Sequence, residues 1–447
     1  MNIIFVYSLD DIQSSTNLLQ TQQQMQFGIS YISSLLKQHG HHTKLLVISR
    51  ILQNKNREIL DEYINDFQPQ VICFTAVATE YPFIAGIAKH IRKTYKDIFL
   101  LIGGSHASLK PDEVQFGDFD ALCIGEGEHP TLELISQLKQ GLYPRGIPNL
   151  WIRQGSKFEK NLPRPFIQNL DDLPFPDRAM WGKWTEDKLG KVTSVLIGRG
   201  CPFNCTYCCN HALKKLTSGT YVRFRSPDNI IKEIRDIISQ FPDVEEIFLE
   251  VETIAINIDW ATELCSELKD LNATLAQPLS FGTNVRITPN ARLEELFESF
   301  RESNFRFVNI GLESGSERVR REILKRNYSN EDVINAVVLA RKYGLQVAFF
   351  NIIGIPGETI DDFNETVTIN RVCQPDWHMT SIFFPYSGTD LYDLCEKQGL
   401  LKKPLEVKME RKKSHWTFPN FLKNKFIKHI YGLTTMLIRA LNQCTKY

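Results

Sequence analysis

The sequence predicts an α/β protein in which an N-terminal doubly wound parallel sheet precedes an open (β/α)6 barrel and a small helical C-terminal extension. Short apolar runs alternate with segments of helical periodicity through residues 1–140, and the same alternation recurs about six times from Val192. A proline-rich stretch separates the two regions. We therefore expect four segments, with bounds 1–140, 141–185, 186–395 and 396–447.

The N-terminal sheet is predicted from apolar runs that end in turn residues. The expected strands are Asn2–Tyr7, His42–Ser49, Val71–Ala76, Ile98–Ile102 and Ala121–Ile124. Apolar residues at helical spacing occupy 26–40, follow near 82–95 and begin again at Pro130. This alternation predicts parallel strands, and a ligand of such a sheet lies beyond their carboxyl ends.

Two glycine-rich turns fall at those carboxyl ends. They are Gly103-Gly104-Ser105-His106 and Gly125-Glu126-Gly127. Glycine lets the backbone approach a ligand closely, although such turns also occur for tight chain reversal alone. The two turns are therefore candidate ligand contacts, and the simpler alternative stays open for each of them.

The stretch 141–185 contains prolines that interrupt long helices and strands. The run from Leu150 to Arg153, a turn at Gly155 and the residues from Phe158 predict a small hairpin. The rest is either an inert spacer or a segment that shapes the site. In the second case Trp181 and Trp184 would contact the substrate or a cofactor.

The barrel is predicted from six strand and helix pairs. The expected strands are Val192–Gly198, Glu246–Glu250, Leu279–Val285, Phe307–Gly311, Gln346–Ile352 and Trp377–Phe383. The helices expected between them are Pro227–Gln240, Asp259–Leu271, Ala291–Ser299, Asn330–Tyr343 and Ile360–Val372. Six pairs are too few to close an eight-fold barrel, so we expect an open one.

Polar side chains gather at the ends of these strands, as they do where strand ends line a site. They are Glu250, Glu252, Asn284, Arg286, Glu313 and Ser314. A carboxylate such as that of Glu250 can accept a hydrogen bond from an ammonium group, or it can belong to a solvated acidic turn. Asn284 and Arg286 alternate with Val285 and can point to one face, where they suit hydroxyl and carboxylate groups.

Three closely spaced cysteines follow the first barrel strand, in the sequence Gly198-Arg-Gly-Cys-Pro-Phe-Asn-Cys-Thr-Tyr-Cys-Cys-Asn210. Cys201, Cys205 and Cys208 are spaced C-x3-C-x2-C, so their thiolates must curl around one object. Three thiolates on a cubane iron–sulfur cluster leave its fourth iron open. A partial zinc site is the alternative, although no second Cys/His pair follows at zinc spacing. Cys209 lies outside the motif and is either a core thiol or part of the site.

At these residues the chain resembles the radical S-adenosylmethionine (SAM) enzymes, whose signature is CxxxCxxC with an aromatic residue, here Tyr207, before the last cysteine. The resemblance implies a [4Fe–4S] cluster on the three cysteines and SAM chelated to the open iron. One electron, from an external donor of the flavodoxin or ferredoxin type, would cleave SAM to a 5′-deoxyadenosyl radical. It further implies that Glu250 or Glu252 meets the SAM amino group. Asn284 and Arg286 would then meet its ribose and carboxylate, with Glu313 and Ser314 as further polar contacts.

The N-terminal region resembles the cobalamin-binding domain that precedes many radical SAM domains. The resemblance is carried by FGISYISSLLKQHGHHTKLLV, IGGSHAS and CIGEGE, taken in that order. It implies that the two glycine turns, Gly103 to His106 and Gly125 to Gly127, cradle the nucleotide tail of cobalamin. The chain has no D-x-H-x-x-G, the motif that supplies a histidine to cobalt. The resemblance therefore implies cobalamin bound without a histidine ligand, or no cobalamin; for His106 a hydrogen-bonding loop role is favoured over a metal ligand.

Composition limits the partners. The formal net charge is zero, so we expect no general attraction to nucleic acid. No basic and apolar leader opens the chain and no apolar run is long enough to span a membrane, so we expect a cytoplasmic protein with reduced cysteines. The basic tail beyond residue 400 is a helix packed on the barrel, a contact for an anionic substrate, or a peripheral membrane contact.

These observations predict a cobalamin-dependent radical SAM enzyme that methylates an unactivated carbon of a small molecule or natural product. A cyclase or rearrangement enzyme with the same cofactors is one alternative, and an iron–sulfur electron-transfer or redox protein is another. The sequence assigns no catalytic residue beyond the cofactor contacts, and it does not identify the substrate.

Overall fold

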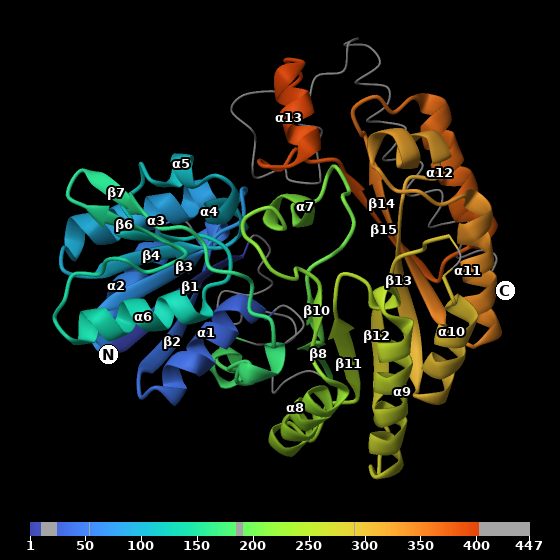
Figure 1. Cartoon of the computed structure of the whole chain (residues 1–447), viewed down its shortest axis with the longest axis horizontal. Helices are drawn as coiled ribbons and strands as arrows, with labels where there is room; N and C mark the ends of the chain where they lie inside the picture. The colour runs from blue at the N-terminus through green and yellow to red at the C-terminus, as the bar shows by residue number, and fades with distance from the viewer. Residues whose placement is uncertain (10–24, 53, 185–190, 290, 402–447) are drawn as a thin grey trace. The chain divides into compact units, whose positions relative to one another are not determined.

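The computed structural model describes residues 1–9, 25–52, 54–184, 191–289 and 291–401 (Figure 1). The chain forms two compact units. The first comprises Met1–Gly200, Ala212–Ser226 and Glu233–Val244, and the second comprises Cys201–His211, Pro227–Lys232 and the chain from Glu245. The basic tail predicted as a helical extension lies outside the described residues from 402 onward.

The first unit is built on a sheet in the strand order β2-β1-β3-β4-β5-β6-β7. Its strands are β1 Asn2–Leu9, β2 His42–Ser49, β3 Val71–Thr75, β4 Phe99–Gly103, β5 Ala121–Cys123, β6 Leu150–Gln154 and β7 Lys157–Lys160. Its helices are α1 Phe27–Gln38, α2 Lys55–Phe67, α3 Tyr81–Thr94, α4 Ser105–Leu109, α5 Pro111–Val114 and α6 Glu128–Lys139. The strands from β2 to β5 pair in parallel, which confirms the predicted doubly wound sheet.

The layers of this unit follow from its apolar runs. Ile3 to Val6 of β1 are all buried, as expected for a parallel strand covered on both faces. Figure 1 shows α1 and α6 on one side of the sheet and α3 on the other. The order β2-β1-β3 reverses direction at β1, and ligands of doubly wound sheets bind beyond the strand ends at such a point.

The stretch 141–184 folds as part of the first unit. β6 and β7 form the predicted hairpin and extend the sheet antiparallel to β5. Of the two alternatives for this stretch, the one in which Trp181 and Trp184 contact the substrate or a cofactor was wrong, because both indoles are buried in the core of this unit. Trp181 Nε1 donates to Ser30 Oγ at 2.8 Å, and Trp184 Nε1 donates to the Leu45 carbonyl at 3.0 Å. Buried indoles need such a partner, and both rings serve packing.

A buried charge cluster fastens the end of this stretch. Glu233 accepts from Arg178 at 2.6 Å and from Arg225, and all three side chains are buried. Arg178 also donates to Thr193 Oγ1 and to the Ser194 carbonyl, both in β8, Val192–Leu196. The stretch is therefore anchored to the following strand.

The structure breaks the first predicted barrel strand in two. Ile197 separates β8 from β9, Gly198–Arg199, which pairs antiparallel with β10, Arg223–Phe224. Gly200 follows with φ +86°, and a Cβ atom there would lie 2.1 Å from the Tyr221 carbonyl oxygen. Only glycine fits this position, so the chain turns sharply just before Cys201.

The second unit contains parallel strands in the order β15-β14-β13-β12-β11. They are β11 Glu246–Glu250, β12 Ser280–Val285, β13 Phe305–Glu313, β14 Gln346–Ile353 and β15 Trp377–Ile382. The helices are α7 Asn210–Leu213 and α8 Pro227–Gln240, which each span both units, and α9 Ile258–Ala273, α10 Leu293–Glu302, α11 Asn330–Lys342, α12 Ile360–Cys373 and α13 Asp390–Lys397. Figure 1 shows α9 to α12 side by side along one face of this sheet. The strand and helix alternation predicted from Val192 is thus confirmed.

Local sequence explains where the helices of this unit begin. Ser329 caps α11 and Thr359 caps α12, and in each case the aspartate three residues later bonds back to form a capping box. Within the described residues no helix combines the length and the hydrophobicity that crossing a membrane requires.

Candidate cofactor sites

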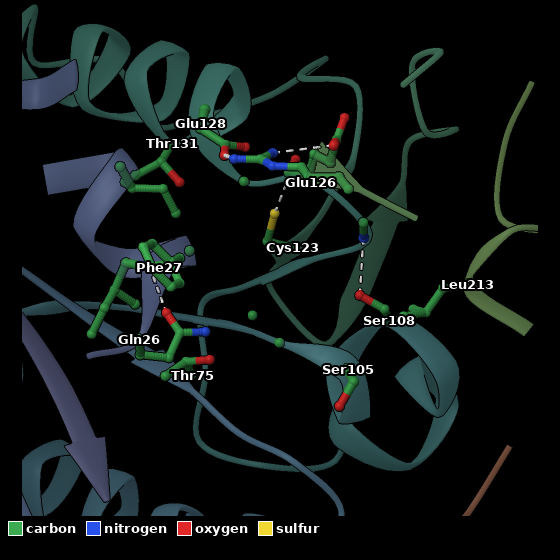
Figure 2. Close-up of a pocket in the computed structure, with 18 of the residues that line it drawn as sticks. Gln26, Phe27, Thr75, Ser105, Ser108, Cys123, Glu126, Glu128, Thr131 and Leu213 are labelled. Carbon is green, nitrogen blue, oxygen red and sulfur yellow. Dashed lines mark hydrogen bonds and ion pairs between the residues drawn. The ribbon is translucent and has the colours of Figure 1, made fainter. Parts of the chain in front are cut away.

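A cavity of about 320 Å³ opens at the carboxyl ends of β1, β3, β4 and β5 in the first unit (Figure 2). Six predicted contacts line it: Gly103, Gly104, Ser105, Gly125, Glu126 and Gly127. Other lining residues include Gln26, Phe27, Thr75, Ser108, Cys123, Thr131, Arg199 and Arg223. The structure therefore brings both glycine turns to one cavity, at the edge of the sheet where a ligand was expected.

Gly104 shapes the wall of this cavity. Its φ of +95° lies in a region that side chains rarely adopt, and an added Cβ atom would lie 2.6 Å from the Ala76 carbonyl oxygen. On the neighbouring turn the Gly125 amide donates to Ser108 Oγ at 2.9 Å, as Figure 2 shows. Both turns thus hold the backbone close to the cavity, which fits a large ligand tail lying against main chain.

His106 does not line the cavity. Its ring is buried in α4 with its centroid 4.5 Å from that of Tyr81, and its Nε2 atom lies 3.7 Å from Glu113 Oε1. Its position in the glycine turn suggested a cofactor contact. His106 lies in the short helix α4, however, where its side chain points into the core. The structure therefore gives His106 a packing role in the first unit.

Two arginines that the sequence reading did not single out line the cavity beside the second turn. Arg199 donates to Glu126 at 3.1 Å and to Glu128 at 2.7 Å, and Arg223 lies 2.9 Å from Glu126. Two cations face two carboxylates, so the charges balance. Both carboxylates therefore have cationic partners within the first unit.

The second candidate site is the cysteine loop of the second unit. Cys205 is buried, whereas Cys201 and Cys208 are half-buried. Within the described residues no three His, Cys, Asp or Glu side chains are gathered closely enough to hold a single metal ion. A cubane cluster does not require this, because each thiolate binds a different iron and the sulfurs stand farther apart. Three thiols fit a cubane cluster, whereas a structural zinc site uses four ligands.

Hydrogen bonds fasten this loop to its own unit. Thr206 Oγ1 donates to the Ile323 carbonyl at 2.7 Å, and the Leu391 amide donates to the Thr206 carbonyl at 3.0 Å. The Cys208 amide donates to the Cys205 carbonyl at 3.1 Å. Burial raises the pKa of Cys201 to about 11, so a thiolate there needs a cationic partner such as iron.

Arg286 lies against the middle cysteine. Its Nη1 atom donates to Cys205 Sγ at 2.9 Å, and its guanidinium lies 3.7 Å from the centroid of the Phe203 ring. Its backbone amide donates to Thr253 Oγ1 at 2.8 Å. Arg286, the residue predicted to meet a SAM carboxylate, is thus held next to the cysteine sulfur that would bind the cluster.

The two acidic candidates near the end of β11, Glu250 and Glu252, differ in their burial. Glu250 is partly buried, while Glu252 is exposed. Burial, with the nearby charge of Glu252 as a smaller cause, raises the pKa of Glu250 to about 7. A carboxylate in such a place gains from a cationic ligand, so Glu250 is the better candidate for the SAM ammonium group.

The side chains of Asn284 and Ser314 already form hydrogen bonds within the second unit. Asn284 Nδ2 donates to the Val251 carbonyl at 2.9 Å, and its Oδ1 accepts from Asn309 at 3.2 Å. Ser314 is fully buried and lies 3.4 Å from Thr366 Oγ1. Neighbours in the second unit thus hold Asn284 at the end of β12 and Ser314 in the loop that follows β13.

Tyr207 and Glu313 both accept hydrogen bonds from Arg326, a residue that the sequence analysis did not single out. Arg326 Nη1 donates to Tyr207 Oη at 2.9 Å and to Glu313 Oε1 at 3.0 Å. No motif marked Arg326, which follows a five-residue π-helical turn, Val319–Ile323. Only the folded chain brings it to the cysteine loop.

Comparison with known proteins matches a family model to each of the two regions of the chain. The B12 binding domain family model matches residues 22–135, and the Radical SAM superfamily model matches residues 195–368. A protein of Pyrococcus horikoshii named as an uncharacterised methyltransferase is 27% identical over 84% of this chain and 79% of its own length. The anaerobic magnesium-protoporphyrin IX monomethyl ester cyclase of Rubrivivax gelatinosus is 24% identical over 81% of this chain and 65% of its own length.

Among solved structures, the radical SAM methyltransferase TsrM from Kitasatospora setae, with cobalamin and a [4Fe–4S] cluster bound, has a TM-score of 0.70. The match covers 90% of this chain and 79% of that chain at 16% identity, so the likeness concerns the fold. Because a B12-binding domain and a radical SAM domain follow one another here, the chain belongs to the cobalamin-dependent radical SAM enzymes, which use a [4Fe–4S] cluster, SAM and cobalamin.

Proposed function

We propose that this enzyme transfers a methyl group to an unactivated carbon of a small molecule or natural product. The observation that carries the proposal is the pairing of the two domains in a chain that resembles a relative named as a methyltransferase over 84% of its length. Bound together, the three cofactors supply a hydrogen-abstracting radical and a transferable methyl group. An external electron donor of the flavodoxin or ferredoxin type is part of the proposal.

The second unit would hold the cluster and SAM. Cys201, Cys205 and Cys208 supply three thiolates, and Arg286 is close enough to Cys205 to reach an anionic group beside the cluster. Glu250 offers a partly buried carboxylate to the SAM ammonium. These side chains orient SAM, and their burial excludes water from the charges that bind it.

The first unit would hold cobalamin against its glycine turns. The backbone at Gly104 and Gly125 approaches the cavity, while the Glu126 side chain is engaged by Arg199 and Arg223. Main-chain groups rather than charged side chains would therefore contact the cofactor tail. His106 is directed into the core, which supports cobalamin binding without that histidine as a ligand.

A cyclase or rearrangement enzyme is the second candidate. It is favoured by the likeness to the Rubrivivax gelatinosus cyclase, which covers 81% of this chain. Both candidates use the same cofactors, so the site residues above do not separate them. They differ in the products formed from SAM.

The test uses the full chain, produced with hydroxocobalamin and reconstituted without air. Corrinoid absorbance, iron and acid-labile sulfide report the cofactors, and SAM with a reductant reports the chemistry. Formation of S-adenosylhomocysteine alongside 5′-deoxyadenosine supports the methyltransferase. Formation of 5′-deoxyadenosine without S-adenosylhomocysteine supports the cyclase or rearrangement enzyme. A chain that binds the cluster but never cleaves SAM supports the redox protein. Cys205→Ala should lose iron, whereas Cys209→Ala, the matched neighbour outside the motif, should keep it.

A further inference from the structure

Arg326 is a buried cation, 5% exposed, that uses nearly all of its donors. Beyond its bonds to Tyr207 and Glu313, its Nε atom donates to Tyr328 Oη at 3.1 Å and its Nη2 atom to the Gly311 carbonyl at 2.8 Å. An arginine in such a planar fork fixes the geometry of its acceptors more firmly than a lysine can. Arg326 therefore defines where these acceptors stand.

The acceptors come from two segments that carry predicted cofactor contacts. Tyr207 lies between Cys205 and Cys208 in the cysteine loop, and Glu313 ends β13. Glu313 has φ +61°, an uncommon conformation for a residue other than glycine, and such conformations persist only where surrounding contacts hold them. The ion pair with Arg326 is such a contact.

We propose that Arg326 is a positioning residue that locks the loop between Cys205 and Cys208 to the carboxyl end of β13. It acts through the Tyr207 hydroxyl, which sets the backbone that carries both cysteines. The inference rests on the proposed role of the three cysteines as cluster ligands. It assigns no contact between Arg326 and the cluster.

Arg320 provides a matched control from the same segment. It is a fully buried arginine, and it donates to the Ser314 carbonyl at 2.7 Å, to the Tyr328 carbonyl at 3.2 Å and to Asn330 Oδ1 at 2.7 Å. It thus shares Tyr328 with Arg326, but its own partners lie outside the cysteine loop. Replacing either arginine should lower stability, since each satisfies buried carbonyls, but only Arg326 should affect the cysteine loop.

The experiment compares Arg326→Lys, Tyr207→Phe, the double variant and Arg320→Lys as full chains reconstituted without air. Iron and sulfide per chain and the electron paramagnetic resonance spectrum of the reduced cluster are measured, together with the melting temperature before reconstitution. We expect Arg326→Lys and Tyr207→Phe to lower cluster content or alter the spectrum. The double variant should be no worse than the more severe single one, because both changes remove the same hydrogen bond between Arg326 and Tyr207. Arg320→Lys should lower only the melting temperature.

Tyr207→Phe removes a single oxygen atom and keeps the test valid if Arg326→Lys does not fold. Wild-type content and spectrum in Tyr207→Phe would overturn the inference, as would additive effects in the double variant or the same spectral change in Arg320→Lys. A wild-type chain that binds no cluster would instead refute the proposed function. The two failures are thus distinguishable.

Discussion

Gly104→Ala should damage the proposed cobalamin site, whereas the adjacent Gly103→Ala should be tolerated. At Gly104 a Cβ atom would lie 2.6 Å from the Ala76 carbonyl oxygen and 2.8 Å from its amide nitrogen, in a backbone conformation with φ +95°. At Gly103 the nearest atom to a new Cβ would be Cys123 Cβ at 3.6 Å, an ordinary contact, and φ is not positive. Both glycines line the same cavity.

The size of the effect follows from two terms. Holding a residue other than glycine in a sparsely populated backbone region costs about 1–3 kcal/mol. Forcing an extra carbon against fixed main chain costs about 1–3 kcal/mol more. We therefore expect Gly104→Ala to lower the free energy of unfolding of the first unit by roughly 2–6 kcal/mol, and Gly103→Ala to change it by less than about 1 kcal/mol.

The assay is urea unfolding of the full chain without cofactors, followed by the corrinoid absorbance of protein produced with hydroxocobalamin. Gly104→Ala should unfold at lower urea and retain less corrinoid than Gly103→Ala. Equal unfolding midpoints and equal corrinoid content in the two variants would refute the role assigned to this turn.

Two further predictions concern buried carboxylates. In the wild type the SAM affinity should rise as pH rises through about 7, because only the ionised Glu250 carboxylate attracts an ammonium group. In Glu250→Gln the SAM affinity should be weaker and nearly independent of pH. Calorimetric titration of the reconstituted chain with SAM measures both. Without SAM, the raised pKa of Glu250 adds stability that is fully present below pH about 4.5 and is lost as pH rises through about 7. Glu233→Gln should lower the free energy of unfolding, measured with urea, by about 3–5 kcal/mol, because Arg178 and Arg225 would lose their buried counter-charge. Asp228→Asn, which breaks an exposed ion pair of the same helix, should lower it by only about 0–1 kcal/mol.

Contrary results would be clear in both cases. An unchanged pH profile after Glu250→Gln would show that another group binds the ammonium. Similar unfolding midpoints for Glu233→Gln and Asp228→Asn would show that the buried cluster adds no more than the surface pair.

Local patterns predicted the parts of the molecule that depend on local sequence. The glycine turns after Ile102 and Ile124 could be placed at strand ends because apolar runs and breakers mark those ends, and parallel strands share one edge. The same logic placed Glu250 and Asn284 at the ends of β11 and β12. Six of the seven predicted residues in the two glycine turns reached the cavity for this reason.

The errors arose where tertiary contacts decide. His106 lies one residue beyond a cavity residue, yet the short helix α4 directs its ring into the core. Trp181 and Trp184 lie in a proline-rich stretch whose role the sequence left open, but Ser30 and Leu45, far away in sequence, accept their N–H groups. Arg326 was missed because its partner Tyr207 is 119 residues away. Periodicity does not report contacts of this range.

The first unit takes segments from both sides of the cysteine loop, and this interleaving limits how the protein can be cut. A fragment ending near residue 185 would contain the whole cobalamin-type sheet but neither Arg199 nor Arg223. Glu126 and Glu128 would then face the cavity without their cationic partners. We therefore expect such a fragment to bind corrinoid poorly even if it folds, because residues that follow it in the chain complete the lining of the proposed cobalamin cavity.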